Sequence, residues 1–241
     1  MESPDQFPIE NGFRMRGARI SRIDVFSDVA LGFALVLLAV SLAIPKSFTD
    51  LRDPDPSLIT SFVCFLMLVG AWYSQYVFFR RYGLHDQVTV ILNAALVFLI
   101  LFCAYPLKFL YTSIFRYLVR NDFSPRFAAA VQINGMLVLY ALGFTTVFML
   151  IAALYWNGWH HRESLLLNGV ERLLTVSSIV DALGVSAIGL IACLAALVVP
   201  PKWAIFSAAV YILVLPWKAL NTFYFGRKAR TLRKLVVAPT L

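Results

Sequence analysis

Long apolar segments recur from one end of this 241-residue chain to the other, and they constrain its fold more than any other feature. The chain is 60% hydrophobic and only 14% charged, with a mean hydropathy of +0.77. A soluble domain is closer to half apolar and a quarter charged. No soluble fold can hide this excess from water, so the sequence predicts an integral membrane protein surrounded by a lipid bilayer.

Six of the apolar segments are long enough to cross a bilayer as helices, which takes about 20 residues each. They cover residues 25–44, 57–80, 89–111, 134–157, 179–200 and 203–225. Lipid offers no hydrogen-bonding partner to the backbone, and the period-two alternation of a membrane β-barrel is absent. No second copy of the pattern is visible. We therefore predict an all-α integral membrane protein with six transmembrane helices in a single repeat.

The polar residues divide the chain into an N-terminal segment (1–21), a six-helix domain (22–225) and a basic tail (226–241). Because six is an even number of spans, both termini lie on the same side of the membrane. The segments on that side contain 13 Lys and Arg residues and those on the other side contain seven, with Lys218 inside the last span left out of both counts. Basic loops stay in the cytoplasm, so a plasma-membrane protein with both termini cytoplasmic is predicted. The sequence YTSIFRYL within the basic third connection (112–133) favours an interfacial helix there.

Signatures of other functional classes are absent from the sequence. The net charge of +8 is explained by cytoplasmic basic residues rather than by a nucleic-acid partner. No H-E-x-x-H, P-loop, G-x-G-x-x-G or G-x-S-x-G pattern occurs, so neither an enzyme nor a cofactor is predicted. The adjacent His160 and His161 point about 100° apart on a helix and are unsuited to sharing a metal ion. We expect them to belong, with Trp156 and Trp159, to a membrane-interface belt.

The three cysteines, Cys64, Cys103 and Cys193, all lie inside apolar segments. They have neither the short paired spacing of a zinc site nor the even number that a disulfide framework requires. We expect them to be small buried hydrophobic residues.

Ionisable residues at or inside the predicted spans are few, and each is therefore informative. Lys218 is expected to reach the interface with its ammonium group, and Asp181 to lie in the opening turn of its helix. Asp24 and Asp28 share a helix face and repel each other unless a cation or hydrogen-bond donor lies nearby. Arg22 is six positions from Asp28 and does not pair with it directly, so each charge must find a partner on a neighbouring helix.

Candidate partners lie on the second and third predicted spans. The second ends in AWYSQYVFFRR, which contains Trp72 and Gln75, and the third begins VTVILNAALVF, which contains Asn93. Polar side chains in lipid usually form hydrogen bonds between helices. Two compatible interpretations remain: these residues only hold helices together, or they anchor a helix whose other face has a function.

Four residues at the start of the first predicted helix form a recognisable signature. Arg22, Phe26, Ser27 and Asp28 give Arg-x-x-x-Phe-Ser-Asp at the start of the first predicted helix. With Trp72 and the FFRR that ends the second helix, LNAALVFLILFCAYPL in the third and FAAAVQINGMLVLY leading into the fourth, the chain resembles the transmembrane protein 175 potassium channels in their single-repeat prokaryotic form. The resemblance covers nearly the whole chain and is close up to about Trp156.

The resemblance implies a homotetramer in which four copies of the first helix line a central pore that lets potassium ions leak passively across the membrane. It implies that Phe33 forms the narrowest ring, with further lining from Val36 and Val40 and with Leu37 beside them. Relatives usually carry Ile or Leu at the Phe33 position and often Thr at the Val36 position, so the constriction expected here is wholly apolar. A ring of this kind gates by dewetting.

The resemblance also implies a polar network that anchors the pore helix to the second and third helices. Its expected members are Arg22, Phe26, Ser27, Asp28, Trp72, Gln75 and Asn93. Gln75 and its neighbour Tyr76 stand where relatives tend to carry His.

Two other functional classes stay open. A secondary transporter would favour internal repeats, broken helices and buried ionisable groups, none of which is clear in this sequence. A non-conducting membrane scaffold with the same fold is compatible with the apolar stripe at Phe33, Val36 and Val40. From the residues alone, that stripe is also an ordinary lipid-facing or bundle-facing surface.

Overall fold

A computed structural model of the chain describes residues 7–10, 12–17, 20–40, 56–120, 130–200, 207 and 209–237. Two short strands precede six helices in these residues. In chain order the elements are β1 (Ile9–Glu10), β2 (Phe13–Arg14), α1 (Arg22–Val40), α3 (Pro56–Tyr82), α4 (Gln87–Arg120), α5 (Ala130–His160), α6 (Gly169–Val198) and α7 (Val214–Val237). The predicted all-α membrane fold with six helices is confirmed, with one β-hairpin added to it.

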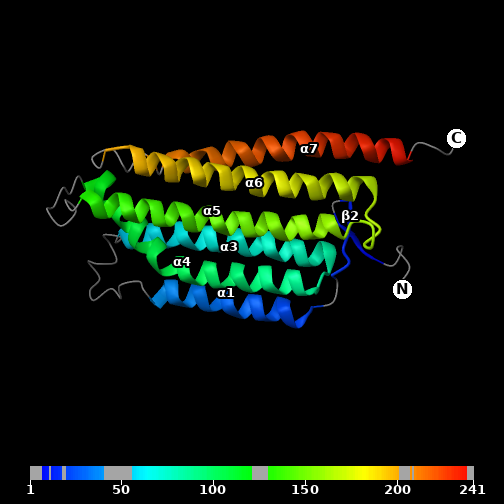
Figure 1. Cartoon of the computed structure of the whole chain (residues 1–241), viewed down its shortest axis with the longest axis horizontal. Helices are drawn as coiled ribbons and strands as arrows, with labels where there is room; N and C mark the ends of the chain where they lie inside the picture. The colour runs from blue at the N-terminus through cyan, green and yellow to red at the C-terminus, as the bar shows by residue number, and fades with distance from the viewer. Residues whose placement is uncertain are drawn as a thin grey trace.

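The six helices lie side by side with their long axes nearly parallel (Figure 1). Helix α1 lies at one edge of the bundle, where it packs on α3 and α4. Helix α7 lies at the opposite edge and packs on α6. The hairpin and the last turn of α7 lie at the same end of the bundle, which we call the terminal end (Figure 1).

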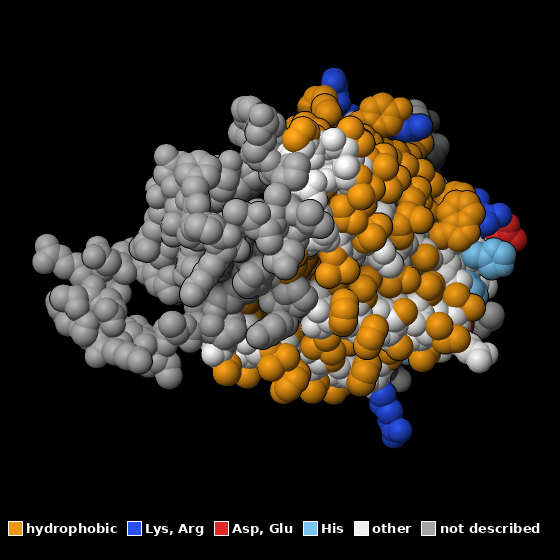
Figure 2. Space-filling model, turned by 60° about the vertical axis from the view of Figure 1, so that its left-hand side comes forward, with side chains coloured by type: hydrophobic (Ala, Val, Ile, Leu, Met, Phe, Trp, Pro, Cys, Tyr) orange, Lys and Arg blue, Asp and Glu red, His pale blue; other side chains and the backbone are white. Residues whose placement is uncertain are grey.

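The dimensions and the surface of the bundle suit a bilayer. The segments Arg22–Val40, Asn134–His160 and Gly169–Val198 combine sufficient length with sufficient hydropathy for a span, and Gln87–Cys103 is apolar but shorter. Figure 2 shows a broad apolar outer surface, with the charged side chains along its margins. Such a surface is unfavourable in water and is solvated by lipid tails in a membrane.

Three predicted boundaries were wrong, because hydropathy marks the apolar part of a helix rather than the helix itself. Helix α6 begins at Gly169 instead of residue 179, because Asn168 and Glu171 form a reciprocal capping box ahead of the apolar part. The last helix, predicted over 203–225, begins as an α-helix at Val214 and runs on to Val237, while residues 203–206 and 208 lie outside the described residues. Helix α4 continues without interruption to Arg120, so residues 112–120 belong to it and form no separate interfacial helix; residues 121–129 lie outside the described residues.

The β-hairpin at the terminal end is held by a buried carboxylate. Its strands pair with Ile9 opposite Arg14, and its turn contains Gly12 at a φ of 78°, a conformation that glycine adopts without strain. The carboxylate of Glu171 is fully buried and lies 3.0 Å from Arg14 Nε and 2.9 Å from Arg16 Nη2. The hairpin thereby joins the start of α6 to the segment that leads into α1.

Aromatic rings fill the interior next to the hairpin. Phe13 packs edge-on against Tyr82 at 5.5 Å between ring centroids, and Phe78 and Tyr155 contact the same tyrosine ring. The Tyr82 hydroxyl lies 2.7 Å from Thr175 Oγ1. Large rings with one satisfied polar atom bind the hairpin, α3, α5 and α6 into one core.

Helices α6 and α7 are joined by an ion pair, which corrects two of the predictions. Asp181 lies in the middle of α6 rather than in its opening turn, because the helix begins at Gly169. Lys218, expected to extend its ammonium group to the interface, instead places its Nζ 2.7 Å from Asp181 Oδ2. The two charges satisfy each other between helices that are packed together, where each alone would be costly.

The turn between α3 and α4 is organised by Asp86. Its carboxylate accepts hydrogen bonds from Thr89 Oγ1 at 2.5 Å and from Asn157 Nδ2 at 3.1 Å. Burial raises the pKa of Asp86, but the hydrogen bonds from Thr89 and Asn157 outweigh it and the pKa lies below its ordinary value. The turn is therefore held as a charged, fully bonded cap at the start of α4.

Candidate functional site: the first helix and its anchor

Helix α1 has two distinct faces. Ser27, Leu31, Ala34 and Leu38 are buried, at the spacing of a helical face that packs on α3 and α4. The opposite face carries the residues predicted to line a pore, which are exposed by 58% at Phe33, 55% at Val36, 41% at Leu37 and 76% at Val40. All four belong to one continuous apolar stripe on the free side of α1.

The polar residues at the start of α1 bond to two neighbouring helices. Trp72 on α3 donates from its Nε1 to Asp28 Oδ1 at 2.8 Å. Asn93 on α4 donates from its Nδ2 to Ser27 Oγ at 2.8 Å and accepts a hydrogen bond from Gln75 Nε2 on α3. Five of the seven predicted network residues are thus joined into two connected groups.

The middle of this network is fully buried. Gln75 is 2% exposed, Ser27 3% and Asn93 1%. Ser27 Oγ in turn donates to the carbonyl of Ile23 at 2.9 Å, so the hydrogen bonds run in one direction from Gln75 through Asn93 and Ser27 to the backbone of α1. A relay of this kind fixes the rotation of α1 about its own axis, because turning the helix would break it.

The other two predicted members are not part of the network. Phe26 is 57% exposed and Arg22 is also exposed, and among the described residues neither side chain forms a hydrogen bond or ion pair with the bonded groups. Asp24 pairs locally with Ser21 instead: its Oδ2 accepts from Ser21 N at 2.9 Å, while Asp24 N donates to Ser21 Oγ at 3.3 Å. The Ser-x-x-Asp spacing of this capping pair was a readable signal that the sequence analysis missed.

A cavity of about 350 Å³ with charged and polar residues in its walls lies beside the network, between the start of α1 and α3. Asp24, Asp28, Trp72 and Gln75 contribute to its walls. Two oxygens on the cavity residues, Asp24 Oδ1 and Gln75 Oε1, are buried without a hydrogen-bond partner among the described residues. At the terminal end of α1, the site thus combines a polar anchor, held by hydrogen bonds, with a cavity large enough for water molecules.

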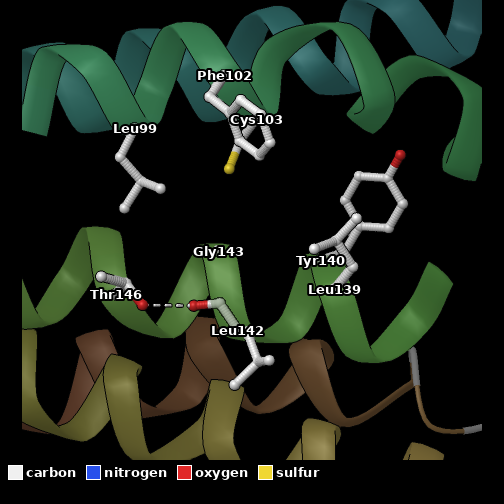
Figure 3. A pocket seen from close by; sticks show the side chains of 8 residues that line it. All are labelled: Leu99, Phe102, Cys103, Leu139, Tyr140, Leu142, Gly143 and Thr146. Atoms are coloured by element: carbon white, nitrogen blue, oxygen red, sulfur yellow. Dashed lines mark hydrogen bonds between the residues drawn. The ribbon is translucent and has the colours of Figure 1, made fainter. Parts of the chain in front are cut away.

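A second pocket, between α4 and α5, has a different character (Figure 3). It measures about 190 Å³ and is lined mainly by apolar groups, with Cys103 directing its sulfur between the helices and Thr146 bonded to the Leu142 carbonyl at 2.8 Å. Its Cys103, like Cys64 and Cys193, is a free thiol. This pocket offers no cluster of oxygen ligands to an ion.

No group of three or more metal-ligating side chains occurs in the part of the chain that the structure describes. His161 Nδ1 is 3.0 Å from the Asn157 carbonyl oxygen, and the ring of His160 stands edge-on to it at 5.8 Å between centroids. The two histidines lie at the terminal end of α5, beside Trp159.

Comparison with known proteins places this geometry in a family. The sequence profile described as "Endosomal/lysosomal potassium channel TMEM175" matches residues 22–106, which include α1 and the whole polar network. A potassium channel from Marivirga tractuosa is 33% identical over 232 residues, covering 91% of this chain and 93% of that protein.

Two solved structures share the fold. A crystal structure of a variant of the potassium channel MtTMEM175, in complex with a nanobody–MBP fusion protein, has a TM-score of 0.75 and 30% identity, covering 92% of this chain and 99% of that one. A lysosomal potassium-selective channel TMEM175 homolog from Chamaesiphon minutus has a TM-score of 0.57 at 18% identity, covering 83% and 96% of the two chains. These relatives are ion channels and not enzymes. With an identity of 33% maintained over nearly the full length of both chains, this membrane protein belongs to the TMEM175 potassium channel family.

Proposed function

We propose that this chain forms a potassium-permeable leak channel of the plasma membrane, in which α1 lines a central pore. Membership of the family supports potassium as the permeant ion, and one observation supports α1 as the helix that lines the pore. The free face of α1 is an apolar stripe, while the buried face of the same helix is fixed by the network of Ser27, Asp28 and Asn93. A helix anchored on one side and free on the other is suited to form part of a pore wall.

A single helix does not enclose a pore, so several copies of the chain are required, and closed cyclic symmetry is the usual solution. We propose a homotetramer with α1 at its centre. The position of α1 at the edge of the bundle supports this arrangement, because the helix is accessible to other copies (Figure 1).

The constriction is proposed at Phe33, followed by Val36 and Val40 with Leu37 beside them. Apolar rings exclude water when narrow, so conduction requires that the ring widens or that its side chains move aside. The anchor network would then hold the backbone of α1 in place while the ring opens and closes.

The orientation proposed is with both termini in the cytoplasm, together with segment 1–21 and the basic tail 226–241. The excess of Lys and Arg in the segments of that side supports it, 13 against seven. Arg14, Arg16 and Arg80 lie together near the hairpin at the terminal end.

The experiment is a flux assay on the full chain in liposomes loaded with potassium, comparing wild type with Phe33→Ala. We expect passive flux in the wild type and a severalfold higher flux in the variant, because trimming the ring removes its widest apolar side chains. The matched control is Phe98→Ala, which trims a phenylalanine on α4 that is 69% exposed, against 58% for Phe33, and is expected to leave the flux unchanged.

Three results would contradict the proposal. Absence of flux in both Phe33 forms would leave a non-conducting scaffold. Flux that requires a second ion gradient would identify a transporter. An equal increase in the Phe98→Ala control would mean that the ring is not at Phe33.

A further inference from the structure

Six residues of α7 are spaced by four, three, four, three and four positions and therefore lie on one line along the helix. All are exposed. They are Pro216, Leu220, Phe223, Arg227, Arg230 and Lys234, and we call them the α7 stripe.

The α7 stripe faces away from the rest of the molecule. The opposite side of α7 packs on α6 through Trp217, whose Nε1 donates to the Asp181 carbonyl at 3.2 Å, and through Asn221, whose Nδ2 donates to the Ser177 carbonyl at 3.1 Å. Ala229, on the same side, is buried. Because α7 lies at the edge of the bundle opposite α1, its outward face meets lipid when α1 faces other copies (Figure 1).

The chemistry of the stripe changes at its midpoint. Leu220 is 65% exposed and Phe223 60%, whereas the three positions that follow are all basic. The Arg227 guanidinium lies over the Phe223 ring at 5.1 Å from its centroid, which places the change of character at one turn of helix. Aromatic and basic side chains side by side are typical of the level of the lipid headgroups.

The basic half of the stripe has no counter-charge among the residues that the structure describes. Helix α7 contains no Asp or Glu. None of Arg227, Arg230 and Lys234 forms an ion pair with a carboxylate in the described ranges of the chain. Three cations on one face, separated by about one turn each, create a local positive potential that an external anion can neutralise.

We propose that the α7 stripe binds an anionic phospholipid, with an acyl chain along Pro216, Leu220 and Phe223 and the headgroup phosphate on Arg227, Arg230 and Lys234. A lipid matches both halves of the stripe, because it joins an apolar chain to an anionic head. A free phosphate would use only the basic half. This site is separate from the proposed pore helix and does not depend on ion conduction.

The test measures lipid binding by native mass spectrometry of the full chain in a nonionic detergent. Dioleoyl phosphatidylglycerol and dioleoyl phosphatidylcholine are titrated in parallel. We expect the wild type to retain phosphatidylglycerol in preference to phosphatidylcholine. The variant Arg227→Gln/Arg230→Gln/Lys234→Gln is expected to lose about tenfold or more in apparent affinity for phosphatidylglycerol, because the cations that attract the anionic head are removed.

The matched control is Arg162→Gln/Arg172→Gln/Lys228→Gln, which also removes two arginines and one lysine, but at positions outside the stripe. An equal loss in this control, or no preference in the wild type, would overturn the proposal. Competition by glycerol 3-phosphate at the same concentration as the lipid would also overturn it, by identifying a site for free phosphate.

A second measurement on the wild type keeps the proposal testable if the triple variant fails to fold. Raising KCl from about 0.1 M to about 1 M shortens the Debye length from roughly 10 Å to roughly 3 Å. The preference for phosphatidylglycerol should decrease severalfold. A preference that does not change with salt would contradict a headgroup bound by exposed cations.

Discussion

At the scale of single residues, the packing of α1 against α3 and α4 depends on a few polar atoms in apolar surroundings. Asn93 is the clearest example, because it accepts from Gln75 and donates to Ser27, and so joins α3, α4 and α1 through one amide. A buried polar group left without its partner costs about 1–3 kcal/mol. The stability of the α1 anchor should therefore depend on Asn93 more than on the exposed residues around it.

Replacing Asn93 by Leu, which has a similar size, tests this dependence. The substitution leaves the Gln75 amide without its acceptor inside the bundle, and we expect a loss of about 1–3 kcal/mol in the free energy of unfolding. The measurement is thermal unfolding of the purified protein in detergent. Thr146→Val serves as control, because Thr146 is exposed and, among the described residues, its hydroxyl bonds only to the Leu142 carbonyl of its own helix. Equal midpoints for the two variants would show that the relay contributes nothing.

At the scale of the elements, helix packing depends on where backbones approach closely. Gly184 on α6 lies under the indole of Trp217 on α7, and a methyl group at this position would overlap the ring. The same contact region contains the ion pair of Asp181 and Lys218. Close approach of two helices through a small residue is a common way to pack helices in a membrane.

We expect Gly184→Ala to push α7 away from α6, to lengthen the Asp181–Lys218 contact and to lower the unfolding temperature by several degrees. Thermal unfolding and the rate of proteolysis within α7 would both report the change. Gly70→Ala on α3 is the control, since no atom lies within 4 Å of the added carbon, and alanine is the better helix former there. If both substitutions act alike, the α6–α7 contact is looser than it is in the structure.

At the scale of the whole molecule, the hairpin links distant parts of the chain. Glu171 accepts hydrogen bonds from Arg14 and Arg16 across sequence separations of 157 and 155 residues. The Arg80 carbonyl at the end of α3 extends this junction, because it accepts a hydrogen bond from Gly17 N at 3.0 Å. The segment that enters α1 is thereby fixed to α3 and α6 before the helix begins.

Glu171→Gln should release this junction, because it removes the charge that neutralises two partly buried guanidinium groups. Breaking a buried pair by removing one partner costs about 3–5 kcal/mol. We expect faster trypsin cleavage after Arg14 and Arg16, followed by gel electrophoresis, together with a lower unfolding temperature. Glu163→Gln, at an exposed glutamate, should change neither. A protected hairpin in the Glu171 variant would show that aromatic packing at Phe13 suffices to hold it.

Much of this architecture was predictable because hydropathy responds directly to the solvent. Six apolar segments indicated six helices in lipid, and the rarity of charge within them made Ser27, Asp28 and Asn93 conspicuous. The signature that begins at Arg22 indicated the family, which the comparisons confirmed. The polar members of the anchor could be named in advance, although Arg22 and Phe26 stand apart from the bonded groups in the structure.

The sequence by itself determined the membrane as the solvent and the number of helices, because both follow from composition along short windows. Only the tertiary structure decided which face of α1 is buried, because nearly every residue beyond Asp28 on this helix is apolar and hydropathy cannot distinguish a protein-facing side from a lipid-facing one. The same holds for the hairpin held by Glu171 and for the pair of Asp181 and Lys218. Their partners lie up to 157 positions apart and meet only when the helices have packed.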